Sequence, residues 1–283
     1  MKSLGVRKII NNRIDQCFTE LNALGRTAFL PYITAGDPDF ETSKRILLGL
    51  PAAGADLIEI GMPFSDPMAD GSIIQASSVR ALKSGQTMNK TIDLVRRFRK
   101  SDSKTPIILM GYYNPVYVYG VNRFVSDIKK AGVDGIIIVD LPHDADCELY
   151  APAMNEGLSL IRLVTPTTDH ARLQNIIQHT TGFIYYVSIT GVTGSELTNM
   201  EEVAANVKRI RSASALPIGI GFGIKTHVQV AEISRYADAV IAGSVLINKI
   251  AGTLDENGKS TNKTVCSVLN LVSKLSLPLK LKV

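Results

Sequence analysis

The sequence has few cysteines, and their spacing suits neither a metal site nor a disulfide framework. The three cysteines among its 283 residues, Cys17, Cys147 and Cys266, stand far apart without CxxC or CxxH spacing. This arrangement argues against a disulfide scaffold or a zinc site and fits a reducing compartment. The four histidines show no metal-ligand spacing either, so we expect no catalytic metal.

Long hydrophobic runs are also absent. The longest, such as residues 135–139, have the length of a strand, so the sequence predicts no membrane-spanning helix, which needs about 20 apolar residues. The N-terminus is basic but lacks the apolar core of a secretory signal, and Asp15 and Glu20 count against a transit peptide. We therefore expect a cytoplasmic chain without a membrane partner, with the plastid stroma as the alternative location.

The overall composition is that of a folded globular protein. Hydrophobic residues make up 45% of the chain and charged residues 20%, which excludes disordered, collagen-like and coiled-coil proteins. Lys and Arg exceed Asp and Glu by 31 to 26, so nucleic-acid binding has to be considered. The densest basic cluster, residues 96–100, is more typical of a solvated helix end, and we expect no nucleic-acid partner.

Strand-like and helix-like segments alternate along the whole chain. Several of the strand-like runs are continuously apolar, which is typical of parallel strands buried on both faces. The predicted strands are residues 27–34, 57–61, 106–112, 135–140, 160–165, 184–190, 217–223 and 239–244. Eight such units without a linker predict an α/β fold, a single (β/α)8 TIM barrel domain over residues 1–283. Apolar residues at helical spacing from Val6 to Leu21 predict an extra N-terminal helix.

A doubly wound open sheet is the alternative fold, because alternation alone does not show that the sheet closes. In a barrel, the chemistry belongs at the C-terminal ends of the strands and in the loops that follow them.

Three acidic residues stand in predicted strands, at a strand end or in the loop after a strand. Glu59 lies between two isoleucines, so its carboxyl group either has a raised pKa suited to proton transfer or forms a buried ion pair. Asp70 ends the glycine- and proline-containing loop 61–71, where it either belongs to a site or caps the following helix. Asp140 ends another strand and either faces the site or begins a turn.

Glycines and other small residues follow the last three predicted strands, at 190–194, 221–223 and 243–244. Exposed backbone amides there, with a helix N-terminus after Gly243, predict a phosphate site. No predicted strand contains a lysine, which argues against a Schiff-base aldolase, and no Walker sequence is present. The pattern therefore predicts a cofactor-free acid–base reaction on a phosphorylated small molecule.

The segment LIEIGMPFSDPMADG at 57–71 closely resembles the signature of the tryptophan synthase α-subunit family. Similar segments follow the family's order at 29–38, 114–115, 138–142, 190–194, 221–224 and 242–244. The resemblance implies a (β/α)8 barrel that cleaves indole-3-glycerol phosphate to indole and glyceraldehyde 3-phosphate. It also implies an αββα heterotetramer in which a pyridoxal-phosphate (PLP) β subunit joins indole to serine, with no cofactor in this chain.

The resemblance further implies residue roles by position in these motifs. Glu59 corresponds to the family's proton-shuttling glutamate, Asp70 to the aspartate that contacts the indole N–H, and Tyr185 to a tyrosine near the reacting centre. The implied substrate-binding residues are Tyr32, Met110, Tyr112, Thr193, Gly194, Phe222, Gly223, Gly243 and Ser244. The implied β-subunit contacts are Asp66, Pro67, Asn114, Pro115 and Pro142. A free-standing lyase and a catalytically silent binding subunit are the alternative functions.

Overall fold

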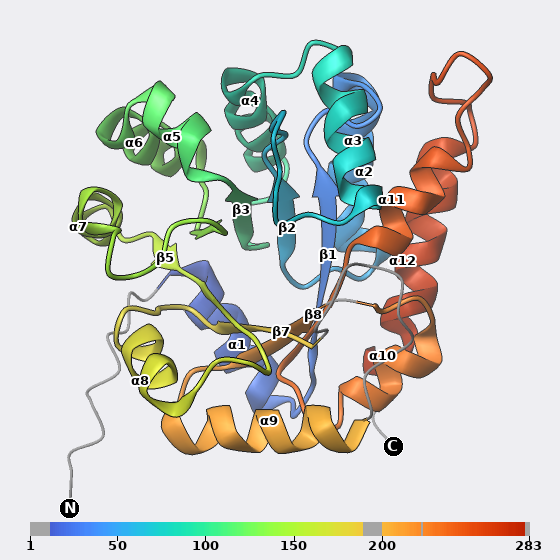
Figure 1. The fold of residues 1–283 in the computed structure, drawn as a ribbon. Coiled ribbons are helices and arrows are strands. Elements are labelled where there is room, and N and C mark those ends of the chain that lie inside the picture. The colour runs from blue at the N-terminus through green and yellow to red at the C-terminus, as the bar shows by residue number, and fades with distance from the viewer. Residues whose placement is uncertain (1–11, 189–199, 222, 281–283) are drawn as a thin grey trace, which may run out of the picture.

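The computed structural model describes residues 12–188, 200–221 and 223–280. In this part of the chain, parallel strands form a central ring and helices surround it (Figure 1). The strands are β1 (Ala28–Thr34), β2 (Ile58–Gly61), β3 (Ile107–Gly111), β4 (Gly135–Ile138), β5 (Ser159–Leu160), β6 (Arg162–Val164), β7 (Ile184–Val187), β8 (Ile218–Gly221) and β9 (Ala239–Ala242). The helices are α1 (Arg13–Ala23), α2 (Phe40–Ala53), α3 (Ser72–Lys83), α4 (Met88–Arg99), α5 (Tyr113–Tyr119), α6 (Val121–Ala131), α7 (Cys147–Asn155), α8 (His170–Gln178), α9 (Met200–Ala213), α10 (His227–Ile233), α11 (Ser244–Ala251) and α12 (Thr264–Lys280).

The two shortest strands close the ring. The sheet order is β5-β4-β3-β2-β1-β9-β8-β7-β6, so β5 and β6 stand at its two ends. Only Ile161 separates them, and its amide donates to the carbonyl of Ile136 in β4 at 3.0 Å. The segment 159–164 is therefore one strand position that pairs with β4 through its first part and with β7 through its second. The predicted (β/α)8 barrel is confirmed, and the open sheet is wrong.

Strand residues point alternately into the barrel and toward the helices. Leu30, Ile108 and Phe183 belong to the apolar cluster that fills the barrel, whereas Phe29 and Ile107 pack in the layer between strands and helices. Because side chains fill the interior, only an end of the barrel is free to hold a site.

Helix α1 closes the N-terminal end of the barrel. Its buried residues Ile14, Phe18 and Leu21 join the interior cluster, and the rings of Phe18 and Phe183 lie 5.6 Å apart. Asn12 caps the helix by accepting hydrogen bonds from two backbone amides of its first turn. The predicted extra helix is confirmed from Arg13 onward, and the earlier part of that prediction lies outside the described residues.

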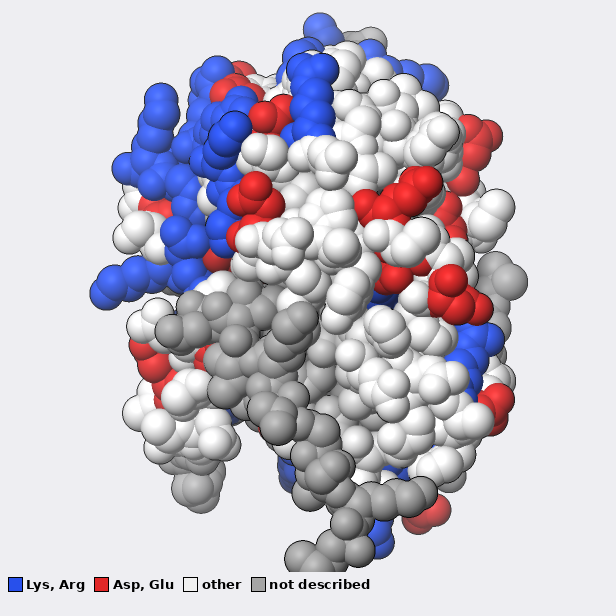
Figure 2. Space-filling model, turned by 90° about the vertical axis from the view of Figure 1, so that its left-hand side faces the viewer, with Lys and Arg blue, Asp and Glu red and all other residues white. Residues whose placement is uncertain are grey.

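Charged side chains lie mostly on the outer helices. Figure 2 views the side that carries α6 and α7 in Figure 1, where Lys and Arg gather in one upper region and Asp and Glu are more scattered. The basic cluster 96–100 forms the C-terminal end of α4, where the helix dipole stabilises positive charge. Two of its arginines pair with carboxylates, Arg97 with Asp93 and Arg99 with Asp134.

No helix of the described residues is both long and apolar enough to cross a membrane.

Candidate active site

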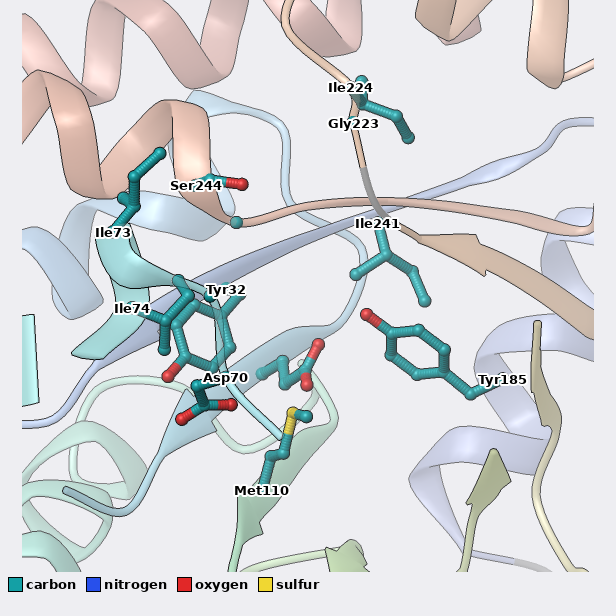
Figure 3. Close-up of a pocket in the computed structure, with 13 residues that line it drawn as sticks. Tyr32, Asp70, Ile73, Ile74, Met110, Tyr185, Gly223, Ile224, Ile241 and Ser244 are labelled. Carbon is teal, nitrogen blue, oxygen red and sulfur yellow. The ribbon is translucent and has the colours of Figure 1, made fainter. Parts of the chain in front are cut away.

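A pocket opens at the C-terminal ends of the strands, where the barrel fold places the chemistry (Figure 3). Strands β1, β2, β3, β7 and β9, the start of α3 and the loops after β8 and β9 contribute side chains to it. Its lining residues are Tyr32, Glu59, Asp70, Gly71, Ile73, Ile74, Met110, Tyr185, Gly223, Ile224, Ile241, Gly243 and Ser244. Eight of the residues singled out in the sequence therefore meet in one place.

Glu59 is buried at the base of this pocket. It points inward from β2 beside Tyr32 of β1 and Ile108 of β3, its register partners, and is 1% exposed. Neither of its carboxyl oxygens has a hydrogen-bond partner among the described residues. Burial, with a smaller contribution from the charge of Asp70, raises the pKa of Glu59 from 4.5 to about 8. The ion-pair alternative is therefore wrong, and the carboxyl group is protonated at neutral pH.

Asp70 faces the same pocket from the loop before α3. The N-cap of α3 is Gly71, without a side-chain hydrogen bond, so the alternative that Asp70 caps this helix is wrong. Burial raises the pKa of Asp70 from 3.8 to about 6, and the hydrogen bond from Tyr112 opposes this rise. The Tyr112 hydroxyl also accepts from the amide of Ala69 at 3.0 Å, which fixes the loop next to Asp70.

The pocket thus holds two carboxyl groups whose pKa values lie on opposite sides of neutrality. Near pH 7, Glu59 carries a proton and Asp70 is mostly ionised. A neutral acid and a fixed carboxylate in one pocket can donate a proton to one atom of a ligand and stabilise positive charge at another.

On opposite sides of the pocket, Tyr32 and Tyr185 each pack over a glycine of the next strand. A Cβ atom on Gly61 would lie 2.0 Å from the Tyr32 hydroxyl, and one on Gly221 would lie 2.5 Å from the Tyr185 hydroxyl. Only glycine therefore leaves room for either ring. Sequence reasoning missed this use of the two glycines, although each is at an inward position of its strand.

The opposite part of the pocket is suited to an anion. Gly243 is the N-cap of α11 and Ser244 its first residue, so backbone amides at a helix N-terminus border the pocket, as predicted. Gly223, with φ of +76°, also lines it. The predicted phosphate ligands Thr193 and Gly194, and the predicted ring contact Phe222, lie outside the described residues.

Apolar side chains also line the pocket. Met110 was expected there, but Ile73 and Ile74 of α3, Ile224 and Ile241 were not. Ile241 could have been found from the alternation of β9, since it is two residues before Gly243 on the same face. Ile73 and Ile74 gave no such signal in the sequence, because their place in the pocket depends on how α3 packs against the barrel.

The residues that the family resemblance places at a partner interface follow three neighbouring strands, at the end of the barrel where the pocket opens. Asp66 follows β2, Asn114 follows β3 and Pro142 follows β4, and all three are exposed; Pro67 and Pro115 are half-buried.

Asp140 accepts a hydrogen bond from the amide of Tyr113 at 2.8 Å and does not line the pocket, so it orders the start of α5 instead. Within the described ranges, no group of three or more His, Cys, Asp or Glu side chains could hold a metal ion.

Comparison with known proteins agrees with this geometry. The family model described as tryptophan synthase alpha chain matches residues 18–275. Tryptophan synthase subunit alpha from Legionella pneumophila str. Paris is 37% identical, with a TM-score of 0.87 over 95% of this chain and 98% of that one. A structure from Aquifex aeolicus VF5 is 34% identical, with a TM-score of 0.85 over 95% and 99% of the two chains. Mycobacterium tuberculosis tryptophan synthase is 30% identical, with a TM-score of 0.86 over 96% and 99%.

The family model covers most of the chain, and the structural match extends over the whole barrel and its pocket. This chain belongs to the tryptophan synthase alpha chain family, whose members cleave indole-3-glycerol phosphate to indole and glyceraldehyde 3-phosphate.

Proposed function

We propose that this chain cleaves indole-3-glycerol phosphate in the pocket described above, with Glu59 transferring protons and Asp70 stabilising charge. The observation that carries the proposal is the state of Glu59. This carboxyl group is buried, protonated at neutral pH and without a partner among the described residues, so its oxygens are available to a ligand. A structural carboxyl group buried at such a cost would be expected to have a partner.

The bond to be broken joins indole C3 to the first carbon of the glycerol chain. Glu59 donates its proton to C3, which turns the ring into an electron-accepting indolenine with positive charge at nitrogen. The Asp70 carboxylate stabilises that charge. The Glu59 carboxylate then takes the proton of the adjacent chain hydroxyl; the carbon–carbon bond breaks, its electrons return to the ring, and the hydroxyl-bearing carbon becomes the aldehyde. The proton balance closes on Glu59, which ends protonated.

Substrate placement follows from the two ends of the pocket. The amides at the start of α11 and beside Gly223 would bind the phosphate, and the wall formed by Ile73, Ile74 and Met110 would pack against the indole ring. Tyr185 would lie next to the reacting centre, because Figure 3 shows its hydroxyl facing the centre of the pocket. Anchoring both ends aligns the bond to be broken with Glu59.

We also propose that released indole passes to a PLP-containing β subunit in an αββα heterotetramer. This chain itself would need no cofactor. The supporting observation is the exposure of large apolar side chains around the pocket mouth: Met68 is 85% exposed, Val118 78% and Tyr117 62%. Exposed large apolar side chains are typical of a protein interface, and these stand close in sequence to the predicted contacts Asp66 and Asn114.

The deciding experiment measures indole release from indole-3-glycerol phosphate by the purified chain, with and without a β subunit. We expect slow release that rises strongly when the β subunit is added. Fast release without it would indicate the free-standing lyase, and no release in either condition would indicate the silent barrel. Glu59→Gln should abolish release, while Glu41→Gln, at an exposed residue of α2, should not. Turnover retained in Glu59→Gln would disprove the role given to this residue.

We further propose that residues 1–283 fold as one domain in the cytoplasm. The free thiols of Cys17, Cys147 and Cys266 support a reducing compartment. A single unfolding transition seen alike by circular dichroism and by calorimetry would support one domain. Two separate transitions would contradict it.

A further inference from the structure

Beyond its first turn, helix α3 is attached to the barrel with little apolar burial; in that turn, the partly buried Ile73 and Ile74 pack against the apolar core. Its fully buried residues are Ser77, Ser78 and Ala81, all of them small, and Val79 is 47% exposed. Burial of such side chains stabilises the attachment far less than a leucine or isoleucine would. The helix also lacks a side-chain hydrogen bond at its N-cap. The position of the rest of α3 therefore depends on other contacts.

Those contacts are polar and join α3 to β1 and the loop after it. Arg80 donates two hydrogen bonds to Asp37, at 2.7 Å to Oδ1 and 2.8 Å to Oδ2, and the side chain of Asp37 is fully buried. The Oγ atoms of Ser77 and Thr34 lie 2.6 Å apart. The Ser84 hydroxyl, just after the helix, donates to a backbone carbonyl of the β1–α2 loop at 3.2 Å. The bidentate pair is the strongest of these, since both partners are charged.

The start of α3 carries three side chains of the pocket. Asp70 is separated from the helix by one residue, and Ile73 and Ile74 belong to its first turn (Figure 3). The preceding loop gives Asp70 little other support, because Met68 and Ala69 are exposed. Asp70 contacts Tyr112, and its amide donates to the carbonyl of Pro67 at 3.0 Å; its other contact is with α3, because Gln75 donates to its carbonyl at 2.8 Å.

We propose that Arg80 is a positioning residue for the cleavage reaction: its ion pair with Asp37 fixes α3 against the barrel and so holds Asp70 at the indole nitrogen. The inference rests on the proposed function of the pocket. In this inference, an ion pair outside the pocket sets the alignment of Asp70, the group that stabilises charge. A displacement of about 1 Å at such a group can cost about 100-fold in rate.

The attachment itself is tested without reference to activity. Hydrogen exchange of the full chain, read by mass spectrometry, should show α3 amides exchanging at least about tenfold faster in Arg80→Met. The matched control is Arg26→Met at the opposite end of the barrel: Arg26 also makes two hydrogen bonds to one carboxylate, and its side chain is 22% exposed, as is that of Arg80. Exchange that is unchanged in α3, or equally faster in all helices, would overturn the inference.

The second arm measures indole release by the same variants alone and in an Asp70→Asn background. Arg80→Met should lower kcat about 10- to 100-fold. KM should rise by a smaller factor, because the displaced Ile73 and Ile74 weaken the contact with the indole ring while the anion-binding part of the pocket stays in place. In the Asp70→Asn background it should lower kcat less than twofold, since the group it positions is gone. If Arg80→Met lowers kcat by the same factor in the wild-type and Asp70→Asn backgrounds, the positioning role is overturned.

A conservative variant guards against misfolding. Arg80→Lys keeps the charge but not the paired hydrogen bonds, so it should fall between wild type and Arg80→Met in both arms. An Arg80→Lys variant whose kcat is as low as that of Arg80→Met, but whose α3 amides exchange at the wild-type rate, would also contradict the inference. If the wild-type chain releases no indole, the proposed function fails, while hydrogen exchange still decides whether the ion pair holds α3.

Discussion

Glu59 is a carboxyl group whose ionisation opposes folding. Its pKa is about 8 in the folded protein and 4.5 ordinarily, so between these pH values the unfolded chain releases a proton that the folded chain keeps. The contribution to stability is therefore fully present below pH 4.5 and is lost as the pH rises through 8. A site that needs a proton donor near neutral pH accepts this cost.

Glu59→Gln should remove that pH dependence, because the amide does not titrate. From pH 5 to pH 8, the free energy of unfolding of the variant should rise relative to wild type by an amount on the order of several kcal/mol. Urea denaturation at the two pH values measures it, with Glu41→Gln as the exposed control. Parallel pH dependence in wild type and Glu59→Gln would contradict the raised pKa.

Tyr112 acts on the second carboxyl group. Tyr112→Phe removes the hydrogen bond that opposes the effect of burial on Asp70, so the pKa of Asp70 should rise above about 6. The acidic limb of the pH–rate profile for indole release should move up by about one pH unit. Tyr119→Phe, which loses a hydroxyl bond to Asp127 outside the pocket, should leave that limb in place. If the acidic limb of the pH–rate profile lies at the same pH in Tyr112→Phe as in wild type, Asp70 is not the group whose ionisation determines that limb.

At the scale of elements, α1 and α3 are attached in opposite ways. Helix α1 places Phe18 against Phe183 inside the barrel, whereas α3 buries small residues and is held by polar contacts. When a buried apolar side chain that attaches a helix is shortened, the free energy of unfolding falls. When an ion pair that attaches a helix is broken, the helix also loses its fixed position.

Phe18→Ala should therefore lower the free energy of unfolding by about 3–5 kcal/mol. Its kcat should stay close to wild type at temperatures where the variant is folded, because α1 closes the end of the barrel away from the pocket. Leu24→Ala, at a residue 67% exposed, should change stability by less than about 0.5 kcal/mol. Chemical denaturation measures both, and a Phe18→Ala variant as stable as Leu24→Ala would contradict the packing role.

At the scale of the whole molecule, the catalytic face combines the pocket mouth with exposed apolar side chains. Val118→Asp, at a residue 78% exposed on α5, should raise the β-subunit concentration needed for half-maximal stimulation about tenfold or more. Indole release by the isolated variant should stay unchanged. Leu277→Asp, at a residue 54% exposed on α12, is the control and should not alter stimulation. Equal effects of the two changes would contradict an interface at the pocket mouth.

The sequence alone predicted the eight strand positions, because continuous apolar runs such as residues 135–138, bounded by turn residues, are typical of strands covered on both faces. It also placed Glu59 inside a strand and Gly243 before a helix, so the pocket's acid and its helix N-terminus followed from local pattern. Closure of the barrel did not follow, since it depends on segment 159–164 pairing on both sides.

Only the tertiary structure decided between the alternatives for single carboxyl groups. Glu59 in an apolar strand fits both an ion pair and a protonated acid, and the choice depends on which side chains the other strands bring near it. Asp70 before a helix fits both a cap and a site residue, and the choice depends on where α3 begins: Gly71 is its N-cap, and the side chain of Asp70 lines the pocket. Strand propensity is a local property of a chain, whereas the pKa and orientation of a buried group are set by neighbours distant in sequence.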